Sequence, residues 1–246
     1  MFLFLKNHPF AVEAHFESSI VLTFAVKETE LRGLIPRCLE LDTFEEDWGF
    51  IAVAMVQTKA LRPKGMPRFF GSDFFLIGYR VFVRYTNELG KRMRGLYILG
   101  SETNSRRMEF FGNIFTHYDY STIDISVQTD GKLTTIESEK ANLKIVLNTT
   151  DEDPALPAMS PFSSWKEARR FAGPLPFTFT FDSASRNVLI VEGVRQQWTP
   201  RPIEVIEQNI GFLRSLGLRT LTLANAFIVE DVPYYWKKGR LEKWRG

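Results

Sequence analysis

Runs of apolar residues, many of them alternating with polar ones, divide most of the chain into predicted β-strands. The runs are rich in valine, isoleucine, phenylalanine and tyrosine, and residues that favour turns separate them. Long strands are predicted over residues 12–26, 48–60, 74–86, 94–102, 143–149 and 221–229. Shorter strands are predicted to pair as two hairpins. These are 118–128 with 132–138, and 176–182 with 187–194. The first is the clearer prediction, because Asp130-Gly131 between alternating strands favours a tight turn.

Helical segments are fewer and mostly short. The predicted helices are 27–36, 104–112, 163–173 and 202–217. Side chains that can accept a hydrogen bond from the first turn are predicted to cap the first three. These caps are Thr29, Asn104 and Ser164. The fourth helix is the strongest prediction, with one apolar face between Pro202 and Gly217. That face comprises Ile203, Ile206, Ile210 and Leu213.

Many strands, few helices and no strand–helix alternation predict a mainly β fold of the α+β class. The expected architecture is an antiparallel sandwich or barrel with helices packed outside. The chain has 246 residues and no segment with the composition of a linker, so a single domain over 1–246 is predicted. Phenylalanine is unusually frequent, with 22 residues against 7 tyrosines and 5 tryptophans. Large apolar rings fill wide interiors, so this excess favours a sizeable core or an internal pocket.

The charges are balanced, with 31 Lys and Arg against 29 Asp and Glu and a net charge of +2. This balance gives no reason to expect a nucleic-acid partner. Cys38 is the only cysteine, which excludes an internal disulfide and a zinc-finger cluster and favours a cytoplasmic protein. Lys6 and Pro9 interrupt the apolar start, and no apolar run is long enough to cross a bilayer. We therefore predict neither a signal peptide nor a membrane partner.

Common catalytic motifs are absent from the sequence. There is no GxxxxGK[ST] or GxGxxG phosphate loop and no GxSxG nucleophile elbow, and the histidines lack HExxH spacing. We therefore predict no cofactor and no metal site. Cys38 follows a proline among apolar residues, where an inert buried thiol is commoner than a nucleophile.

Two basic and aromatic segments each have two interpretations. The loop 61–73 carries three basic residues followed by Phe69 and Phe70. One interpretation is a contact with phosphate or nucleic acid. The other is a solvated loop whose aromatic rings fold back into the core, and the balanced charge favours it. The same choice applies to the tail 233–246, for which a membrane-surface role is a minor alternative.

Arg80 is a charged residue in the centre of the apolar segment 74–83. Strand alternation places it on the opposite face from Tyr79. A guanidinium in so apolar a strand needs a carboxylate partner or a wet cavity. An ion pair with Glu102 and the binding of a ligand are therefore both open interpretations.

The order of several segments resembles the YqjF-like family of uncharacterised proteins, also called the DUF2071 group. The segments are LRGLIPRCLELDTF, WGFIAVAMVQTKALRPKGMP, FFLIGYRVFVRY, RGLYILGSETNSRR, FFGNIFTHYDYS, LTLANAFIV and DVPYYW. The resemblance covers most of the chain. It implies the fold of acetoacetate decarboxylase, a largely antiparallel β-barrel with a few peripheral helices and an interior pocket.

The same resemblance argues against the decarboxylase reaction. Acetoacetate decarboxylase forms a Schiff base on a lysine whose pKa is lowered by a neighbouring cation and an apolar site. Phe115 and Thr116 stand where the resemblance implies two lysines, and Leu76 stands where it implies a carboxylate. Phenylalanine and threonine have no amine, so no imine can form there. Related chemistry would need another lysine in the pocket, such as Lys59 or Lys144, and nothing in the sequence singles out either one.

The resemblance and the residue pattern together indicate a candidate site. Arg80 would hold an anionic group through forked hydrogen bonds. His117 and Glu102 would act as an acid–base pair, since histidine changes charge near neutral pH. The other candidate ligand-binding residues are Arg106 or its neighbour Arg107, Asn104, Tyr79, Tyr97 and Tyr118. Our first hypothesis is therefore a protein that binds a small, anionic organic molecule without covalent lysine chemistry.

Two other hypotheses stay open at this point. One is an enzyme, a lyase or a hydrolase, that uses His117 and Glu102 as acid and base. The other is a non-catalytic interaction protein with a filled barrel and an exposed apolar patch around Phe69, Phe70 and the segment 234–236. Arginine and tyrosine residues near the termini are compatible with a homodimer, although no heptad or sheet-edge pattern specifies one.

Overall fold

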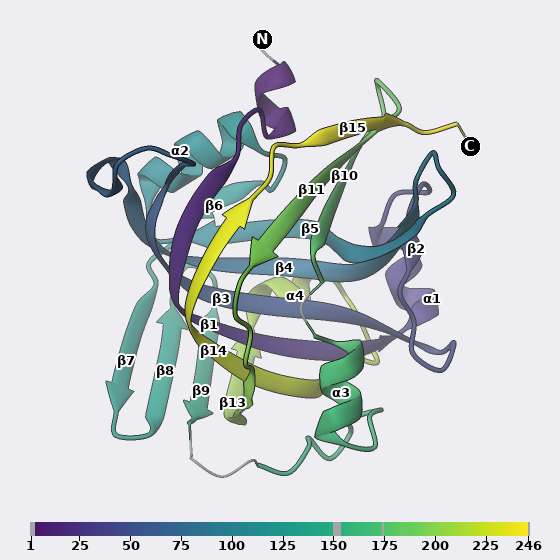
Figure 1. The fold of residues 1–246 in the computed structure, drawn as a ribbon. Helices are drawn as coiled ribbons and strands as arrows, with labels where there is room; N and C mark the ends of the chain where they lie inside the picture. The colour runs from purple at the N-terminus through teal and green to yellow at the C-terminus, as the bar shows by residue number, and fades with distance from the viewer. Residues whose placement is uncertain (1–2, 150–153, 174, 246) are drawn as a thin grey trace.

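Seven strands form a closed ring of paired backbones in the computed structural model, which describes residues 3–149, 154–173 and 175–245 (Figure 1). The ring runs β14–β1–β3–β4–β5–β10–β11 and returns to β14, where Gly193–Arg195 pair with Tyr234–Trp236. Its strands are β1 (Val12–Lys27), β3 (Trp48–Pro63), β4 (Ser72–Thr86), β5 (Arg92–Thr103), β10 (Phe177–Asp182), β11 (Asn187–Arg195) and β14 (Thr222–Trp236). Within the ring only β5 and β10 pair in parallel. The predicted mainly β, largely antiparallel architecture is confirmed.

Short strands extend the ring, and a second sheet lies against its outside. The short strands are β2 (Glu40–Leu41), β6 (Tyr120–Thr122), β12 (Arg201–Pro202) and β15 (Arg240–Lys243). The second sheet has the order β13–β9–β8–β7, with β7 (Ser126–Asp130), β8 (Leu133–Ser138), β9 (Leu143–Asn148) and β13 (Glu204–Ile210). Ile136 and Ile145 from this sheet are fully buried in one cluster with Ile77 of the ring. Burial of apolar area between the two layers therefore holds them together.

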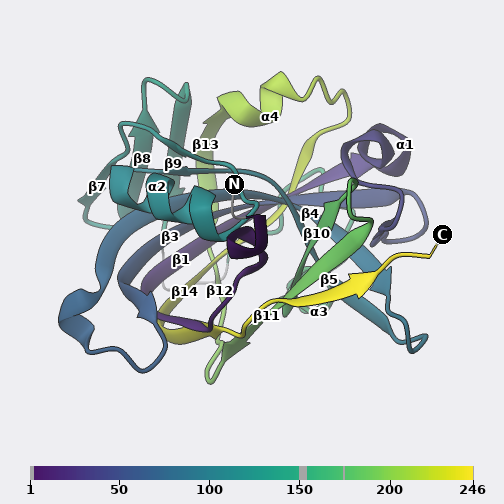
Figure 2. The same ribbon diagram turned by 90° about the horizontal axis from the view of Figure 1, so that it is seen from above.

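Short helices lie at the periphery, as predicted (Figures 1 and 2). The helices are η1 (Leu3–Asn7), α1 (Glu28–Leu31), η2 (Arg32–Leu34), η3 (Arg68–Phe70), α2 (Arg106–Phe115), α3 (Trp165–Phe171) and α4 (Gly211–Ser215). The longest of them, α2, follows β5 at the same end of the ring as η1. Among the residues that the structure describes, no helix is long and apolar enough to cross a membrane.

The alternation of side chains along β4 separates two cores. Ile77 and Tyr79 belong to the outer cluster between the ring and the second sheet. Leu76, Arg80 and Phe82 face the interior of the ring instead. This is the period-2 pattern that the sequence predicted for the segment, and it places Arg80 inside the ring.

The predicted helix 202–217 is wrong. Residues up to Ile210 are extended in β12 and β13, and only α4 is helical. β13 pairs with β9, so its backbone groups are satisfied by a neighbour far away in the sequence. The register shifts between Val205 and Glu207, which leaves Ile206 between them 55% exposed. The helical spacing of the apolar residues was therefore a coincidence, overridden by non-local pairing.

Two predicted caps are corrected and one is confirmed. The side chain of Ser105, not Asn104, accepts the hydrogen bond from the backbone of Met108 at the start of α2. α1 begins at Glu28 without a side-chain cap, so Thr29 lies inside the helix. Ser164 caps α3 as predicted. Both predicted hairpins form, β7 with β8 and β10 with β11. Residues 150–153, in the polar and proline-rich segment of the sequence after β9, lie outside the described part of the chain.

Candidate functional site

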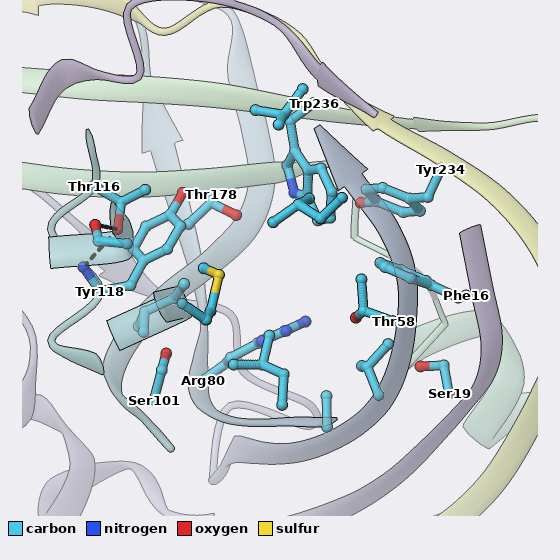
Figure 3. Close-up of a pocket in the computed structure, with 18 of the residues that line it drawn as sticks. Phe16, Ser19, Thr58, Arg80, Ser101, Thr116, Tyr118, Thr178, Tyr234 and Trp236 are labelled. Atoms are coloured by element: carbon cyan, nitrogen blue, oxygen red, sulfur yellow. Dashed lines mark hydrogen bonds between the residues drawn. The ribbon is translucent and has the colours of Figure 1, made fainter. Parts of the chain in front are cut away.

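The ring encloses a cavity of about 430 Å³ that reaches the surface near α2 (Figure 3). Its walls come from strands all around the ring, and α2 and the segment before β1 border its outer end. Phe10, Phe70 and Phe111 line the cavity and are also exposed to solvent, so the opening lies between them.

Small side chains on the inner face of the ring leave this space unfilled. Ala52 and Ala54 follow each other at alternate positions on β3, between the larger Phe50 and Val56. Gly78 lies opposite Ala54 on β4, and a Cβ at Gly78 would stand 2.9 Å from Nε of Arg80. Glycine at this position therefore gives the guanidinium of Arg80 room to lie along the wall.

The charged residues of the lining are of one sign. Arginine is present four times, and neither aspartate, glutamate nor lysine lines the cavity in the described part of the chain. The four are Arg62, Arg80, Arg107 and Arg195. Most of the remaining wall is apolar or aromatic, with scattered hydroxyl groups. A cationic cavity without an acidic group favours an anion over a cation or a neutral polar molecule.

Arg80 is the charge that lies deepest in the ring. It leaves β4 at a register shift next to Tyr79, and its guanidinium reaches toward the middle of the cavity (Figure 3). Nε is buried and has no hydrogen-bond partner, and no carboxylate forms an ion pair with Arg80 among the described residues. Burial lowers the pKa of Arg80, because the charged form loses its hydration. A buried donor without a partner is costly, and at Nε of Arg80 it belongs to a positively charged group that an anion would satisfy.

The other three arginines have protein partners. Arg62 forms an ion pair with Glu13 at 2.7 Å. Arg195 forms a hydrogen bond with the hydroxyl of Tyr234 and lies over the ring of Trp198. Arg107 is exposed on α2, with its guanidinium 5.8 Å from the centre of the Phe111 ring. They add positive potential to the cavity, and among these four arginines the buried donor without a partner is Nε of Arg80.

Hydroxyl groups surround Arg80 on several sides. Tyr118 and Tyr120 come from the segment after α2, and Tyr234 comes from the distant strand β14. Burial raises the pKa of all three phenols, so they stay protonated at neutral pH and can each donate a hydrogen bond. Additional polar side chains of the lining are Ser19, Thr58, Ser101, Thr116 and Thr178. These groups can complete the hydrogen bonds of an anion held by Arg80.

Three of the predicted site residues line the cavity: Arg80, Tyr118 and Arg107, the alternative to Arg106. Tyr79 and Glu102 lie on the outer face of the ring instead, where the Tyr79 hydroxyl donates to Oε2 of Glu102 at 2.6 Å. The Tyr79 ring stacks on Phe212 with centroids 3.9 Å apart. Burial raises the pKa of Glu102. The ion pair between Arg80 and Glu102, one of the two open interpretations, is absent because the two residues lie on opposite faces.

The remaining candidates have partners outside the cavity. Nε2 of His117 lies 3.4 Å from Oδ1 of Asn7, and burial lowers the pKa of His117. Oδ1 of Asn104 accepts a hydrogen bond from the backbone of Phe75 at 2.9 Å. Arg106 is exposed in the first turn of α2, and Tyr97 packs against the outer core. The structure therefore does not bring His117 and Glu102 together at the cavity.

Sequence reasoning missed several polar residues of the wall. Ser19, Thr58 and Ser101 are buried polar residues on three different strands. Their signal in the sequence is a small hydroxyl residue at an inward position of an apolar strand. That signal is weak, because only the closure of the ring shows that such positions face the same space.

Three residues singled out by the resemblance line the cavity: Leu76, Phe115 and Thr116. Neither alternative lysine reaches the cavity. Lys59 lies between Glu17 and Asp73 on the surface, and Lys144 bonds to Glu207 on the second sheet.

Metal and thiol chemistry have no visible support at this site. Within the described ranges, no group of three or more His, Cys, Asp or Glu side chains gathers closely enough to hold a metal ion. Cys38 lies outside the cavity lining, and burial raises its pKa to about 11. A thiol with so high a pKa carries little of the reactive thiolate at neutral pH.

The fold and cavity place this chain among proteins with the acetoacetate decarboxylase fold. It is similar to acetoacetate decarboxylase from Legionella pneumophila, with a TM-score of 0.61, 9% identity, and coverage of 95% of this chain and 87% of the other. An acetoacetate decarboxylase-like enzyme from Sphingomonas wittichii RW1 has a TM-score of 0.58, 8% identity, and coverage of 98% and 95%. The enduracididine biosynthesis enzyme MppR, complexed with pyruvate, has a TM-score of 0.56, 10% identity, and coverage of 95% and 90%. At these identities the likeness shows the fold alone.

The family model DUF2071, described as uncharacterized conserved protein (COG2071), matches residues 13–242. The chain therefore belongs to the DUF2071 family, as the resemblance predicted. No curated protein matches the sequence.

Proposed function

We propose that this protein binds a small organic carboxylate with an apolar body in the cavity, with Arg80 as the residue that holds the carboxylate. The observation that carries the proposal is the buried Nε of Arg80, which lacks a partner in a cavity lined by no acidic side chain of the described chain. A carboxylate matches the planar fork of a guanidinium and would supply two hydrogen bonds to it. Binding would thereby relieve the cost of the unpaired charge.

The size and walls of the cavity support a ligand of moderate size. At roughly 30 Å³ per water-sized atom, a volume of about 430 Å³ holds about 14 non-hydrogen atoms. Three aromatic rings contact one another on one wall: Phe16 stacks on Tyr234 with ring centroids 4.7 Å apart, and Trp236 meets both rings at an angle. Flat apolar groups pack well against such rings. An aryl or branched aliphatic carboxylate fits these features.

The fold supports the same class of ligand by analogy. MppR was solved with pyruvate, which is a small organic carboxylate. This chain lacks a lysine in the described lining, so we propose binding without a covalent imine. An acid–base reaction through His117 and Glu102 has no support from the lining, because both lie outside it.

Paired ligands that differ only in charge test the proposal. We expect phenylbutyrate to bind and to raise the melting temperature, while the neutral phenylbutyramide binds more weakly. Hydrogen bonds to a charged group contribute about 1.5–3 kcal/mol, which corresponds to a preference of roughly 10-fold to 150-fold. Isothermal titration calorimetry over a panel of carboxylates and their amides measures the ratio. Equal affinity for both members of every pair would refute an anion site.

Borohydride trapping tests the absence of imine chemistry. We expect no covalent adduct when the protein is incubated with pyruvate or acetoacetate and then treated with borohydride, because the lining offers no amine. Intact-protein mass spectrometry measures the adduct, and a lysine-dependent acetoacetate decarboxylase serves as the positive control. An adduct that maps to one lysine of this chain would contradict the non-covalent mechanism.

A further inference from the structure

The mouth of the cavity is surrounded by exposed apolar side chains. We call these the apolar rim: Phe10, Met66, Phe69, Phe70, Phe110 and Phe111. Phe69 is 79% exposed and Phe110 is 63% exposed. Of the twelve exposed large hydrophobic residues in the described part of the chain, these six gather here. The predicted packing of Phe69 and Phe70 back into the core is therefore wrong.

Three separate segments bring the rim together at one end of the ring. The loop between β3 and β4 supplies Phe69 and Phe70, α2 supplies Phe110 and Phe111, and the segment before β1 supplies Phe10 (Figures 1 and 2). Phe69 contacts Phe70 with ring centroids 4.2 Å apart, and Phe110 contacts Phe111 at 5.3 Å. One ring from each segment, Phe10, Phe70 and Phe111, lines the same opening. Exposed apolar side chains gathered around an opening mark interaction sites.

The segments that carry the rim are also basic. The loop 61–71 has three basic residues and no acidic one, and α2 has two basic residues and one acidic, which gives a net charge of +4 for the two segments. The whole chain carries +2, so the rest of it carries a net charge of −2. Arg68, Arg106 and Arg107 are exposed beside the apolar rim. Aromatic and basic side chains interleaved on one face are complementary to a bilayer surface with anionic headgroups.

We propose that the apolar rim docks onto a membrane surface that carries anionic lipids, with the mouth of the cavity facing the bilayer. In that position an amphiphilic carboxylate can pass between the lipid and Arg80 without crossing water, a consequence that rests on the proposed function. The docking itself does not require a ligand. This proposal departs from the expectation of no membrane partner, which came from the lack of a spanning segment.

Charge and symmetry favour a membrane over a second copy of the protein or a nucleic acid as the partner of the apolar rim. In a symmetric dimer formed through this face, the exposed Arg68, Arg106 and Arg107 of one copy would meet the same cations of the other. Nucleic acid is held mainly by phosphate contacts along a basic groove, whereas this face exposes six large apolar side chains. A bilayer alone offers both an apolar layer for the rings and anions for the arginines.

Cosedimentation of the full chain with lipid vesicles tests the docking. We expect binding to vesicles of phosphatidylcholine mixed with phosphatidylserine, weaker binding to phosphatidylcholine alone, and a loss of binding as salt is raised. The double variant Phe69→Ser, Phe110→Ser should bind the mixed vesicles at least roughly tenfold less, because it removes two rings that would enter the interface. Arg68→Gln should weaken binding to the mixed vesicles about fivefold and leave phosphatidylcholine binding unchanged.

A matched control separates the rim from exposed apolar surface in general. Leu89 and Leu133 are 89% and 44% exposed away from the rim, since Leu89 follows the opposite end of β4 and Leu133 begins β8 of the second sheet. The double variant Leu89→Ser, Leu133→Ser should bind vesicles like the wild type. Both double variants should keep wild-type melting temperatures, since the replaced side chains are exposed.

The vesicle experiment and the carboxylate experiment can fail independently, so they test the membrane docking and the proposed anion site separately. Carboxylate binding without vesicle binding would overturn the docking and leave the anion site standing. Vesicle binding without carboxylate binding would support the docking and overturn the anion site. Dimerisation that is lost in Phe69→Ser, Phe110→Ser, or preferential binding of an oligonucleotide, would overturn the docking in favour of a different occupant.

Discussion

Replacing Arg80 with methionine is expected to abolish carboxylate binding and, at the same time, to stabilise the ligand-free protein. Loss of a buried charge that is paired with a bound anion costs about 2–5 kcal/mol, so the affinity should fall by at least roughly 30-fold. In the absence of ligand, Arg80 is a desolvated charge with an unpaired Nε. An apolar side chain of similar length removes that cost, and the free energy of unfolding should rise by about 1–4 kcal/mol.

Calorimetry and urea denaturation measure the two effects of this variant separately. Arg80→Lys is the control, because it keeps the charge but loses the planar fork, and we expect intermediate affinity. A substitution that lowers the affinity for the carboxylate but raises the free energy of unfolding indicates a residue retained for binding rather than for folding. Wild-type affinity in Arg80→Met, or a large loss of stability, would show that Arg80 has a structural role instead.

Replacing Asp42 with alanine is expected to cause the largest loss of stability of any single change proposed for this chain. The Asp42 side chain is fully buried, and its two oxygens each lie 2.5 Å from Nε of an arginine, Arg84 and Arg94. Arg94 also donates to the carbonyl of Phe171 at 2.8 Å, which ties α3 to the ring. Removing the carboxylate leaves two cations close together, so the free energy of unfolding should fall by about 3–5 kcal/mol.

A neighbouring ion pair provides the control for Asp42. Glu40 of β2, two residues before Asp42, pairs with Arg92 of β5 at 2.8 Å, but both side chains are more than half exposed. Glu40→Ala should therefore cost less than about 1 kcal/mol. Urea denaturation of both variants measures the difference. If both variants lost the same small amount of free energy of unfolding, Asp42 would not be the residue that holds α3 against the ring.

The sequence predicted the parts of the fold that depend on local pattern. Period-2 alternation in the segment 74–83 correctly placed Arg80 and Tyr79 on opposite faces. The same kind of local pattern failed at 202–217, where helical spacing of isoleucines coincided with a strand that pairs with β9. The difference is physical, because the pairing partner of a strand is set by residues far away in the chain.

The candidate site was predictable only where one strand determines it. Arg80 was found because a guanidinium in an apolar strand is costly wherever it lies. Glu102 was grouped with it by proximity in sequence, yet it bonds to Tyr79 on the outer face. Thr58 and Tyr234 join the site only because β3 and β14 belong to the same closed ring. No pattern within one strand carries that information.

The most direct test of the central claim is a crystal structure of the protein with a carboxylate that binds in the calorimetric panel. We predict that the carboxylate group lies inside the ring within hydrogen-bond distance of the Arg80 guanidinium, and that the apolar body of the ligand packs against Phe16 and Tyr234. A carboxylate bound elsewhere, or a ring interior closed by phenylalanine side chains with Arg80 paired to an acidic residue of the protein, would contradict it.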